Sequence, residues 1–279
     1  MKKKIILLGA NGFFGKNIIS FFKNKYKIKK LFRGDSIDRI NLKNYNYIIN
    51  TAADVYDETT MFKNNTLLVN RVLEKIVCEN KKIVFIHFGS SSEYGAINKK
   101  LAEKDLIIPR NIYEGTKAAA TMLVQAYSKY YKLRTVIIRP FSVYGLYENK
   151  VRLMPNIILH FLKSQKLKIY NGYHDYIYIK DLMLFLQQLI NRNLIREYGE
   201  IINFGGGKQY SNKRILELFE KHFNKKSSAI YIKKFQRSYD KKIWCSNNNY
   251  IKKKFNFKFK FDINTGIEDY IKNYKKNYN

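Results

Sequence analysis

Short apolar runs alternate with longer stretches of helical periodicity along the first half of the chain. The apolar residues at 5–8 predict a buried strand, and the apolar spacing at 13–22 predicts a helix. Further strands are expected at 27–32, 47–50, 83–88 and 135–138, with helices at 59–81 and 118–131. Strands that alternate with helices form parallel sheets covered on both faces. The pattern therefore predicts an α/β protein with a doubly wound parallel sheet.

The alternation weakens in the second half. A helix is expected at 153–162, and further structured segments are expected at 168–170, 176–179, 182–190, 201–204 and 215–223. We therefore expect a larger domain at 1–150, with later segments, about 172–210, partly interleaved. A smaller α/β lobe would take residues 151–279. The segment 252–260 alternates lysine with phenylalanine, which fits a basic surface segment that buries its aromatic rings. Stacking on nucleic-acid bases is the alternative.

A glycine-spaced turn, Gly9, Gly12 and Gly15, connects the first strand to the first helix. A helix N-terminus presents N–H groups and partial positive charge, and glycine lets a phosphate approach the backbone closely. The pyrophosphate of a dinucleotide would fit there. The same glycines also suit a tight turn without a ligand, so other residues must decide.

Arg33 stands at the end of the second strand. In dinucleotide-binding folds this position faces the adenosine ribose, and an acid there pairs with the free 2′-hydroxyl. A guanidinium suits a 2′-phosphate instead, so Arg33 favours NADP(H), with NAD(H) possible. A solvated arginine in a loop is the alternative interpretation.

Candidate chemistry follows the strand at 83–88, where a run of serines, Ser90–Ser92, lies on the expected ligand edge of the sheet. Tyr113 and Lys117 are about one helical turn apart and share a helix face. A lysine ammonium near a phenol favours the phenolate, which would make Tyr113 a general acid or base. Alone the pair fits a solvated helix face, but its place after a strand and a serine turn favours catalysis.

Composition adds a strong positive charge. Lys and Arg number 53 against 22 Asp and Glu, a net charge of +31 over 279 residues. The lysines are spread along the chain without a recognisable nucleic-acid module, so we do not favour nucleic-acid binding, although the charge would attract anionic cofactors and substrates. Cys78 and Cys245 form neither a metal motif nor a disulfide framework, and no apolar stretch reaches membrane-spanning length. We expect a cytoplasmic protein with no metal and no membrane segment.

Taken in order, these motifs resemble the extended short-chain dehydrogenase/reductase family, the NAD(P)-dependent nucleotide-sugar epimerases, dehydratases and reductases. The likeness covers nearly the whole chain. It rests on the glycine turn, Asn50-Thr51-Ala52-Ala53, Gly89-Ser90-Ser91-Ser92-Glu93-Tyr94-Gly95, Tyr113-x-x-x-Lys117, Arg139-Pro140-Phe141-Ser142-Val143-Tyr144-Gly145, His174-Asp175-Tyr176-Ile177-Tyr178-Ile179-Lys180-Asp181 and Ile202-Asn203-Phe204-Gly205.

The resemblance implies a Rossmann-type domain that holds the cofactor and a lobe that binds the substrate. Tyr113 would exchange a proton with a sugar oxygen, Lys117 would lower its pKa and hold the nicotinamide ribose, and Ser90 would hydrogen-bond the reacting carbonyl, with Ser91 as second choice. The residues implied to bind the cofactor are Gly9, Asn11, Gly12, Phe13, Phe14, Gly15, Arg33, Ala52, Ala53, Tyr113, Lys117 and Pro140.

The expected substrate is a nucleoside-diphosphate sugar. Ser91, Ser92, Arg152, His174 and Arg237 are its expected contacts, although His174 replaces the family's phosphate-binding arginine. Family members are often homodimers through two helices per subunit, here 59–81 and 118–131.

The expected reaction is NADP-dependent reduction of a 4-keto-6-deoxy sugar at C4, as in the biosynthesis of deoxysugars and surface polysaccharides. An NAD-dependent epimerase is the alternative. A dehydratase is less favoured, because Ser91 and Ser92 stand where that class has acids and Glu93 fits only by deleting a residue. A different class, a dinucleotide-sensing or nucleic-acid-binding member of the fold, is opposed by the intact Ser90, Tyr113 and Lys117 set.

Overall fold

The computed structural model describes residues 2–95, 97–235 and 242–278 and divides into two compact units. The first unit contains Met1–Ala96, Glu103–Pro140 and Phe185–Asn203. The second contains Ile97–Ala102, Phe141–Leu184 and Phe204–Asn279. The chain therefore passes between the units several times, and α6 (Ile179–Asn191) contributes to both.

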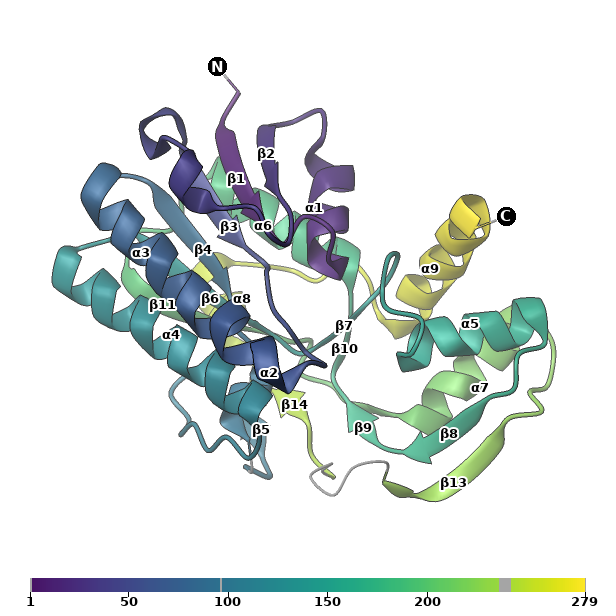
Figure 1. Cartoon of the computed structure of the whole chain (residues 1–279). Helices are drawn as coiled ribbons and strands as arrows, with labels where there is room; N and C mark the ends of the chain where they lie inside the picture. Colours follow the sequence, from purple (N-terminus) through teal and green to yellow (C-terminus); the bar gives the residue numbers. More distant parts are fainter. Residues whose placement is uncertain (1, 96, 236–241, 279) are drawn as a thin grey trace. The chain divides into compact units, whose positions relative to one another are not determined.

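A six-stranded sheet forms the centre of the first unit (Figure 1). Its order is β11-β6-β4-β3-β1-β2, and the β2–β1, β1–β3, β3–β4 and β4–β6 ladders are parallel. The strands are β1 (Lys4–Leu8), β2 (Lys27–Leu31), β3 (Tyr47–Asn50), β4 (Val84–Phe88), β6 (Thr135–Pro140) and β11 (Tyr198–Phe204). The chain order reverses between β1 and β3, and such a reversal is where open parallel sheets bind ligands. The predicted doubly wound, Rossmann-type fold is confirmed.

The link between β2 and β3 is short. It contains only two 3-10 turns, η1 (Ile37–Arg39) and η2 (Leu42–Asn44), so β2 is the edge strand on this side. Ile37 and Leu42 are buried, and the Glu79 carboxylate accepts a hydrogen bond from the Leu42 N–H at 3.0 Å. The buried residues of these two turns therefore fix the segment that follows β2, although no further strand packs against this edge of the sheet.

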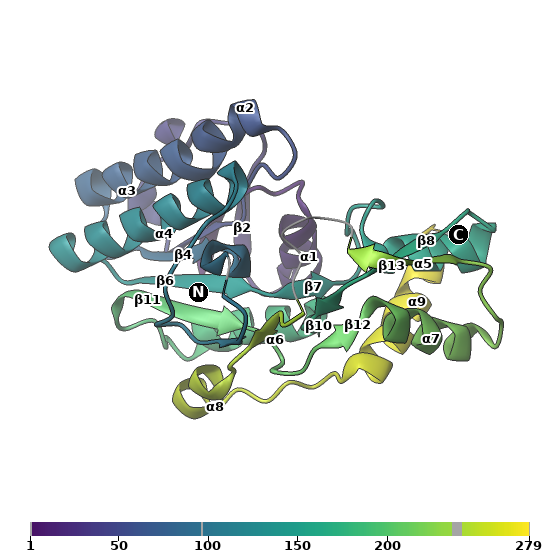
Figure 2. The same ribbon diagram turned by 90° about the horizontal axis from the view of Figure 1, so that it is seen from below.

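Helices cover both faces of this sheet (Figure 2). On one face, α3 (Leu68–Glu79) and α4 (Ile112–Tyr131) lie side by side, and their apolar residues share a core with residues of β1, β3, β4 and β6. On the other face lie α1 (Phe13–Phe22) and the C-terminal part of α6, where Tyr26 Oη donates to Asn191 Oδ1 at 2.5 Å. The expected layers of helix, sheet and helix are present.

The helix expected at 59–81 is interrupted. It consists of α2 (Glu58–Met61), a π-helical turn η3 (Phe62–Leu67) and α3. The side chains of Asn65 and Thr66 are buried in η3 and bond to atoms outside their own helix, among them atoms of Thr116. Single π-helical turns are frequent at functional sites.

The second unit is built from short paired strands and four helices. Parallel pairs are β7 (Ser142–Tyr144) with β10 (Tyr176–Tyr178), β8 (Lys168–Asn171) with β13 (Ile230–Phe235), and β5 (Lys100–Leu101) with β14 (Cys245–Ser246). The antiparallel pair is β9 (Tyr173–His174) with β12 (Tyr210–Ser211). The helices wholly within this unit are α5 (Leu153–Lys163), α7 (Asn212–Phe223), α8 (Asn249–Phe255) and α9 (Ile263–Tyr278).

Asp175 is the polar centre of this unit. Its fully buried carboxylate accepts hydrogen bonds from the N–H groups of Gly206 and Gly207, at 2.9 and 3.0 Å, and from the N–H and hydroxyl of Ser246, at 3.0 and 2.8 Å. Burial raises the pKa of this carboxyl, while these hydrogen bonds lower it. One side chain therefore joins the loop after β11 to β14.

Asp181 anchors the lysine-phenylalanine segment in a similar way. Its buried carboxylate accepts the N–H groups of Lys260 and Phe261, and burial raises its pKa to about 6. Phe255 and Phe257 are only 4% and 5% exposed, so the segment buries aromatic rings as predicted. Across the described residues, no helix is long and apolar enough to cross a membrane.

Replacing Asp175 by alanine should lower the free energy of unfolding by about 3 kcal/mol or more, because several buried N–H and O–H donors lose their acceptor. Chemical denaturation would measure this loss. Asp262→Ala is the matched control, because it removes the exposed acceptor of the Thr265 N–H at the start of α9 and should cost about 1 kcal/mol. Equal losses in the two variants would contradict the role given to Asp175.

Candidate active site

The glycine turn after β1 is too tight for side chains. Gly9 has a left-handed φ of +78°, and a methyl group there would lie 2.6 Å from the Ala52 nitrogen. A methyl group on Gly15 would lie 2.2 Å from the Gly9 carbonyl oxygen. Gly12 donates its N–H to that same oxygen at 3.0 Å and precedes α1 as its N-cap. Two of the predicted cofactor residues are therefore required as glycine by the backbone itself.

The first turn of α1 has the form of an anion site. The first hydrogen bond within the helix runs from the Lys16 N–H to the Gly12 carbonyl at 3.0 Å. The N–H groups of Phe13, Phe14 and Gly15 come before this bond in the chain and therefore have no acceptor within the helix. The turn ends at the point of the sheet where the chain order reverses. Asn11 is exposed beside it. Glycine turn, helix N-terminus and sheet edge together fit a dinucleotide pyrophosphate.

A buried chain of hydrogen bonds holds the segment after β3. The Ala52 N–H donates to Asn50 Oδ1 at 3.0 Å, and Asn50 Nδ2 lies 3.3 Å from His87 Nδ1. Because the amide nitrogen is a donor, His87 Nδ1 accepts and the proton of this imidazole is on Nε2. Burial and the nearby Lys117 charge lower the pKa of His87, so the ring is neutral. The predicted cofactor residues Ala52 and Ala53 thus follow a rigid strand end.

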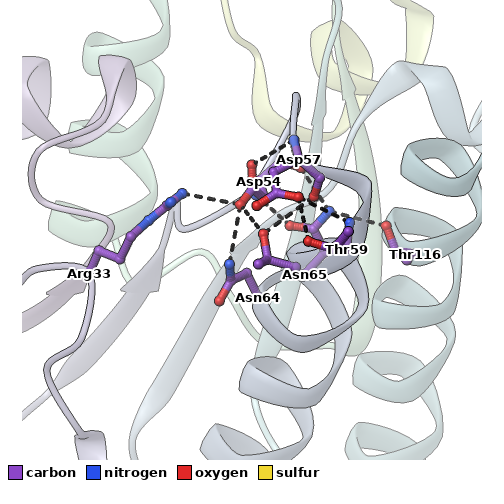
Figure 3. Close-up of polar contacts among 8 residues, drawn as sticks. Arg33, Asp54, Asp57, Thr59, Asn64, Asn65 and Thr116 are labelled. Carbon is purple, nitrogen blue, oxygen red and sulfur yellow. Dashed lines mark hydrogen bonds and ion pairs between the residues drawn. The ribbon is translucent and has the colours of Figure 1, made fainter.

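Arg33 follows β2 and forms an ion pair with Asp54 (Figure 3). Arg33 Nη2 lies 3.3 Å from Asp54 Oδ2, and the arginine side chain is 75% exposed whereas that of Asp54 is 6% exposed. Asp54 also accepts hydrogen bonds from Thr60 Oγ1 at 2.5 Å and Asn64 Nδ2 at 3.3 Å. These contacts lower the pKa of Asp54 against the opposing effect of burial. The carboxylate is therefore charged and fixed, and the arginine docks on it.

Asn65 links the segment around Asp54 to α4 (Figure 3). Its Oδ1 accepts the Asp54 N–H at 2.6 Å, and its Nδ2 donates to the Asp54 carbonyl at 3.0 Å and to Thr116 Oγ1 at 3.1 Å. Thr116 Oγ1 in turn donates to the Tyr113 carbonyl at 3.1 Å. The segment after β3 and the first turn of α4 are therefore connected through a fully buried amide.

The serine run forms a 3-10 turn, η4 (Ser91–Tyr94), directly after β4. Ser90 is its N-cap, and its Oγ accepts the Ser92 N–H at 3.1 Å and lies 2.6 Å from Ser92 Oγ. The Glu93 carboxylate accepts the Ser90 N–H at 2.7 Å. Ser90 and Ser92 are half-buried and Ser91 is buried. Burial favours Ser90 over Ser91 as the hydroxyl presented to a substrate.

Tyr113 and Lys117 both lie in α4, which begins at Ile112, earlier than the predicted residue 118. Asn111 caps the helix by accepting the Glu114 N–H at 2.9 Å. Lys117 is 1% exposed, and its Nζ donates to the Phe88 carbonyl, the last residue of β4. Burial lowers its pKa to about 8, and the Glu93 charge acts in the opposite direction. Lys117 therefore lies beside the strand end that carries Ser90.

The structure groups the predicted residues by unit. Those expected to be catalytic or to bind the cofactor all belong to the first unit, Pro140 included, which ends β6 next to β4. Arg152 and His174 belong to the second unit. Arg152 lies 3.7 Å from Glu148, and His174 Nδ1 lies 3.2 Å from Ser142 Oγ. Arg237, with the Ser238-Tyr239-Asp240 that follows it, lies outside the described residues.

Sequence reasoning missed three polar groups around the site: Asp54, Asn65 and the Glu93–Arg139 pair. Glu93 and Arg139 are fully buried and joined at 2.8 Å. The sequence signal that could have indicated the Glu93–Arg139 pair is the position of Arg139, which directly follows the apolar residues of the expected strand at 135–138. Within the described ranges, no cluster of His, Cys, Asp and Glu is placed to hold a metal ion.

Residues 5–205 match the sequence profile of the NAD dependent epimerase/dehydratase family. The chain belongs to this family. Membership confirms the resemblance to extended short-chain dehydrogenases and agrees with the glycine turn, the serine turn and the tyrosine-lysine helix described above.

Curated members of the family are distant relatives. A dTDP-D-glucose 4,6-dehydratase of Dictyostelium discoideum is 24% identical over 75% of this chain and 60% of its own length. A GDP-6-deoxy-D-talose 4-dehydrogenase of Aggregatibacter actinomycetemcomitans is 27% identical over 77% of this chain and 78% of its own. The Low-salt glycan biosynthesis protein Agl12 of Haloferax volcanii is 30% identical but matched over only 43% of its length. The chain therefore matches less than two thirds of the length of some of these relatives.

Solved structures share the fold at low identity. UDP-glucuronic acid 4-epimerase of Bacillus cereus, in complex with UDP-glucuronic acid and NAD, superposes with a TM-score of 0.85 at 22% identity, covering 99% of this chain and 100% of its own. RMD of Pseudomonas aeruginosa, complexed with NADPH, gives a TM-score of 0.84 at 15% identity and 99% coverage of both chains. At such identities the comparison establishes the fold.

Gly9→Ala should weaken NAD⁺ binding by about tenfold or more and lower the free energy of unfolding by about 2 kcal/mol or more, because the methyl group meets the Ala52 backbone. Calorimetric titration and denaturation would measure both. Gly34→Ala is the control for backbone strain alone, since Gly34 has a φ of +94° but open space around it. An equal loss of NAD⁺ affinity in both variants would contradict the close-approach argument.

Proposed function

We propose that this protein is an NADP-dependent reductase of a nucleoside-diphosphate 4-keto-6-deoxy sugar. The observation that carries the proposal is the serine turn, where Ser90 follows β4 beside Lys117 and the acid of the turn, Glu93, is fully buried and hydrogen-bonded through both oxygens. A carboxylate held in this way is not placed to remove a proton from a sugar. The site therefore suits carbonyl reduction better than dehydration.

Tyr113 is the proposed proton donor to the C4 oxygen. Ser90 would hydrogen-bond the same oxygen, which polarises the carbonyl. The reduced nicotinamide supplies the hydride to C4 when bound. Lys117, with its pKa lowered to about 8, carries a proton at neutral pH, and this charge favours release of the tyrosine proton. The reaction would end with an alcohol at C4 and a tyrosine that regains its proton from solvent.

The residues proposed to bind the substrate diphosphate are Arg152, His174 and Arg237, with Ser91 and Ser92 near the sugar. Arginine matches phosphate oxygens through paired hydrogen bonds. The net charge of +31 would speed the approach of such an anion.

Arg33 supports NADP because its guanidinium stands at the end of β2 and is held on Asp54 with most of its surface exposed. An NAD-dependent epimerase is the second candidate, and Asp54 itself favours it. A carboxylate near the adenosine ribose suits a free 2′-hydroxyl. Several solved relatives of this fold are complexed with NAD.

We also infer a cytoplasmic homodimer. Large apolar side chains are exposed on η3 and α4, where Phe62 is 56% exposed, Leu67 48% and Met122 62%. Exposed apolar residues on adjacent helices are typical of a helix-mediated interface.

Purified protein should oxidise NADPH when a nucleoside-diphosphate 4-keto-6-deoxy sugar is added, which the absorbance of the reduced nicotinamide would follow. Tyr113→Phe should lower kcat by about 100-fold or more while NADPH affinity changes by much less, because the proton donor is lost and the other cofactor contacts remain. Full turnover in this variant would exclude Tyr113 as the donor. Absence of NADPH oxidation with every such sugar, together with NAD retained through purification, would instead favour the epimerase.

Arg33→Ala should weaken NADPH binding by about tenfold or more, because a charge-assisted contact to the 2′-phosphate is lost, and should leave NADH binding within about twofold. Fluorescence titration with each dinucleotide would measure the ratio. Lys30→Ala removes an exposed cation of β2 and is the control for general electrostatic attraction. If the two cofactors lose affinity equally in Arg33→Ala, the proposed 2′-phosphate contact is wrong.

A further inference from the structure

A wholly buried ion pair lies next to the serine turn. Glu93 Oε2 accepts Arg139 Nε–H at 2.8 Å, and both side chains are 0% exposed. The Arg139 guanidinium also lies 4.6 Å from the centre of the Tyr94 ring. In the part of the chain that the structure describes, Arg139 Nη1 and Nη2 have no hydrogen-bond partner. The arginine charge is therefore balanced mainly by the Glu93 carboxylate and the Tyr94 ring, and the same charge also lowers the pKa of Glu103.

Such a pair is a poor way to gain stability. Desolvation of two charges offsets most of their attraction, and apolar residues of similar volume often stabilise a fold as well or better. The unbonded Nη1 and Nη2 groups add a further cost. A role other than stability would therefore account for the pair, and the contacts of Glu93 indicate what it is.

Glu93 holds the backbone of Ser90. Its Oε1 accepts the Ser90 N–H at 2.7 Å, while the preceding N–H, of Gly89, donates to the Ile138 carbonyl at 2.8 Å. A methyl group on Gly89 would lie 2.5 Å from Glu93 Oε1, so the carboxylate occupies the space that a side chain would need. The position of Ser90 thus depends on Glu93, and the position of Glu93 depends on Arg139.

Glu93 also acts on the charge of Lys117. The Lys117 ammonium is buried and donates to the Phe88 carbonyl. The groups facing it are Glu93 from the serine turn and His87 from β4, while Tyr113 shares its helix. His87 is neutral, so Glu93 supplies the negative charge that favours the ammonium. Arg139, on the far oxygen of Glu93, reduces that effect without removing it.

We propose that Glu93 is a positioning residue for the reaction, which orients Ser90 through its backbone and stabilises the protonated form of Lys117, with Arg139 holding the carboxylate in place. The proposal rests on the roles of Ser90, Tyr113 and Lys117 proposed above. It extends them to a pair of charges whose side chains are both 0% exposed.

The test measures Lys117 directly, so it does not require the substrate. In protein labelled with ¹⁵N-lysine, the Lys117 Nζ resonance is assigned by its loss in Lys117→Arg, and it should titrate at a pH of about 8. Glu93→Gln should lower this midpoint by about one pH unit. In Glu93→Gln the N–H₂ group of the glutamine amide would face the Arg139 N–H, and two donors cannot bond to each other. The double variant Glu93→Gln/Arg139→Met removes this conflict and is therefore measured as well. A methionine can pack on the Tyr94 ring, and the double variant should show a downward shift that is smaller than that of Glu93→Gln, because the opposing charge of Arg139 is removed as well.

Glu103→Gln is the matched control. Glu103 lies in the same unit, accepts the Asn203 N–H at 3.0 Å and feels the Arg139 charge, but it makes no contact with Ser90 or Lys117 among those the structure describes, so it tests whether loss of any carboxylate near Arg139 is enough. This variant should leave the Lys117 midpoint unchanged. With a 4-keto sugar as substrate, Glu93→Gln should lower kcat by about tenfold or more at unchanged KM, and the loss of activity at high pH should begin about one pH unit lower.

A folded double variant whose Lys117 titrates as in the wild type would overturn the proposal, whether or not the protein reduces keto sugars. A shifted midpoint in a protein without reductase activity would support the coupling of Glu93 to Lys117 and reject the proposed reaction. A shift in Glu103→Gln equal to that in Glu93→Gln would show a general loss of negative charge and would also overturn it.

Discussion

The close approach of two backbones at the ends of β1 and β3 is the constraint on which the cofactor half of this protein depends. Leu8 and Asn50 are paired in the parallel ladder, and the next residues, Gly9 and Thr51, leave the sheet together. Thr51 donates both its N–H and its hydroxyl to the Leu8 carbonyl, at 3.1 and 2.9 Å. One contact therefore fixes both the start of α1 and the segment that contains Ala52 and Ala53.

The ends of β4 and β6 combine a glycine, Gly89, with buried charge. Lys117, Glu93 and Arg139 alternate in sign across the buried space between the serine turn and α4. Removing charged groups from water strengthens their mutual interaction, so small changes in one alter the protonation of the next. The ends of β1 and β3 are thus defined by steric fit, and the ends of β4 and β6 by electrostatics as well.

Periodicity predicted the strands at the centre of the sheet well, because buried parallel strands are continuous apolar runs such as residues 47–50. It placed the start of α4 too late, because the alanines after 117 dominated the pattern whereas Asn111 caps the helix. The π-helical turn around Asn65 was not predicted, and the buried partner of Asn65, Thr116, is far away in sequence. A local sequence pattern does not show which distant residue a side chain will contact in the folded protein.

The site shows the same limit. The glycine turn and the tyrosine-lysine pair could be predicted from the sequence, because the geometry of each depends only on residues that are close in sequence. Arg139 directly follows an apolar run in the sequence, but its burial against Glu93 is seen only once β4 and β6 are paired. Arg33 is the sharpest case. The sequence shows a cation after β2, but Asp54, 21 residues further along the chain, meets it beyond the ends of β2 and β3. A fixed carboxylate both orients the guanidinium and offsets its charge, so the charge presented beyond β2 depends on the balance within the pair rather than on the arginine alone.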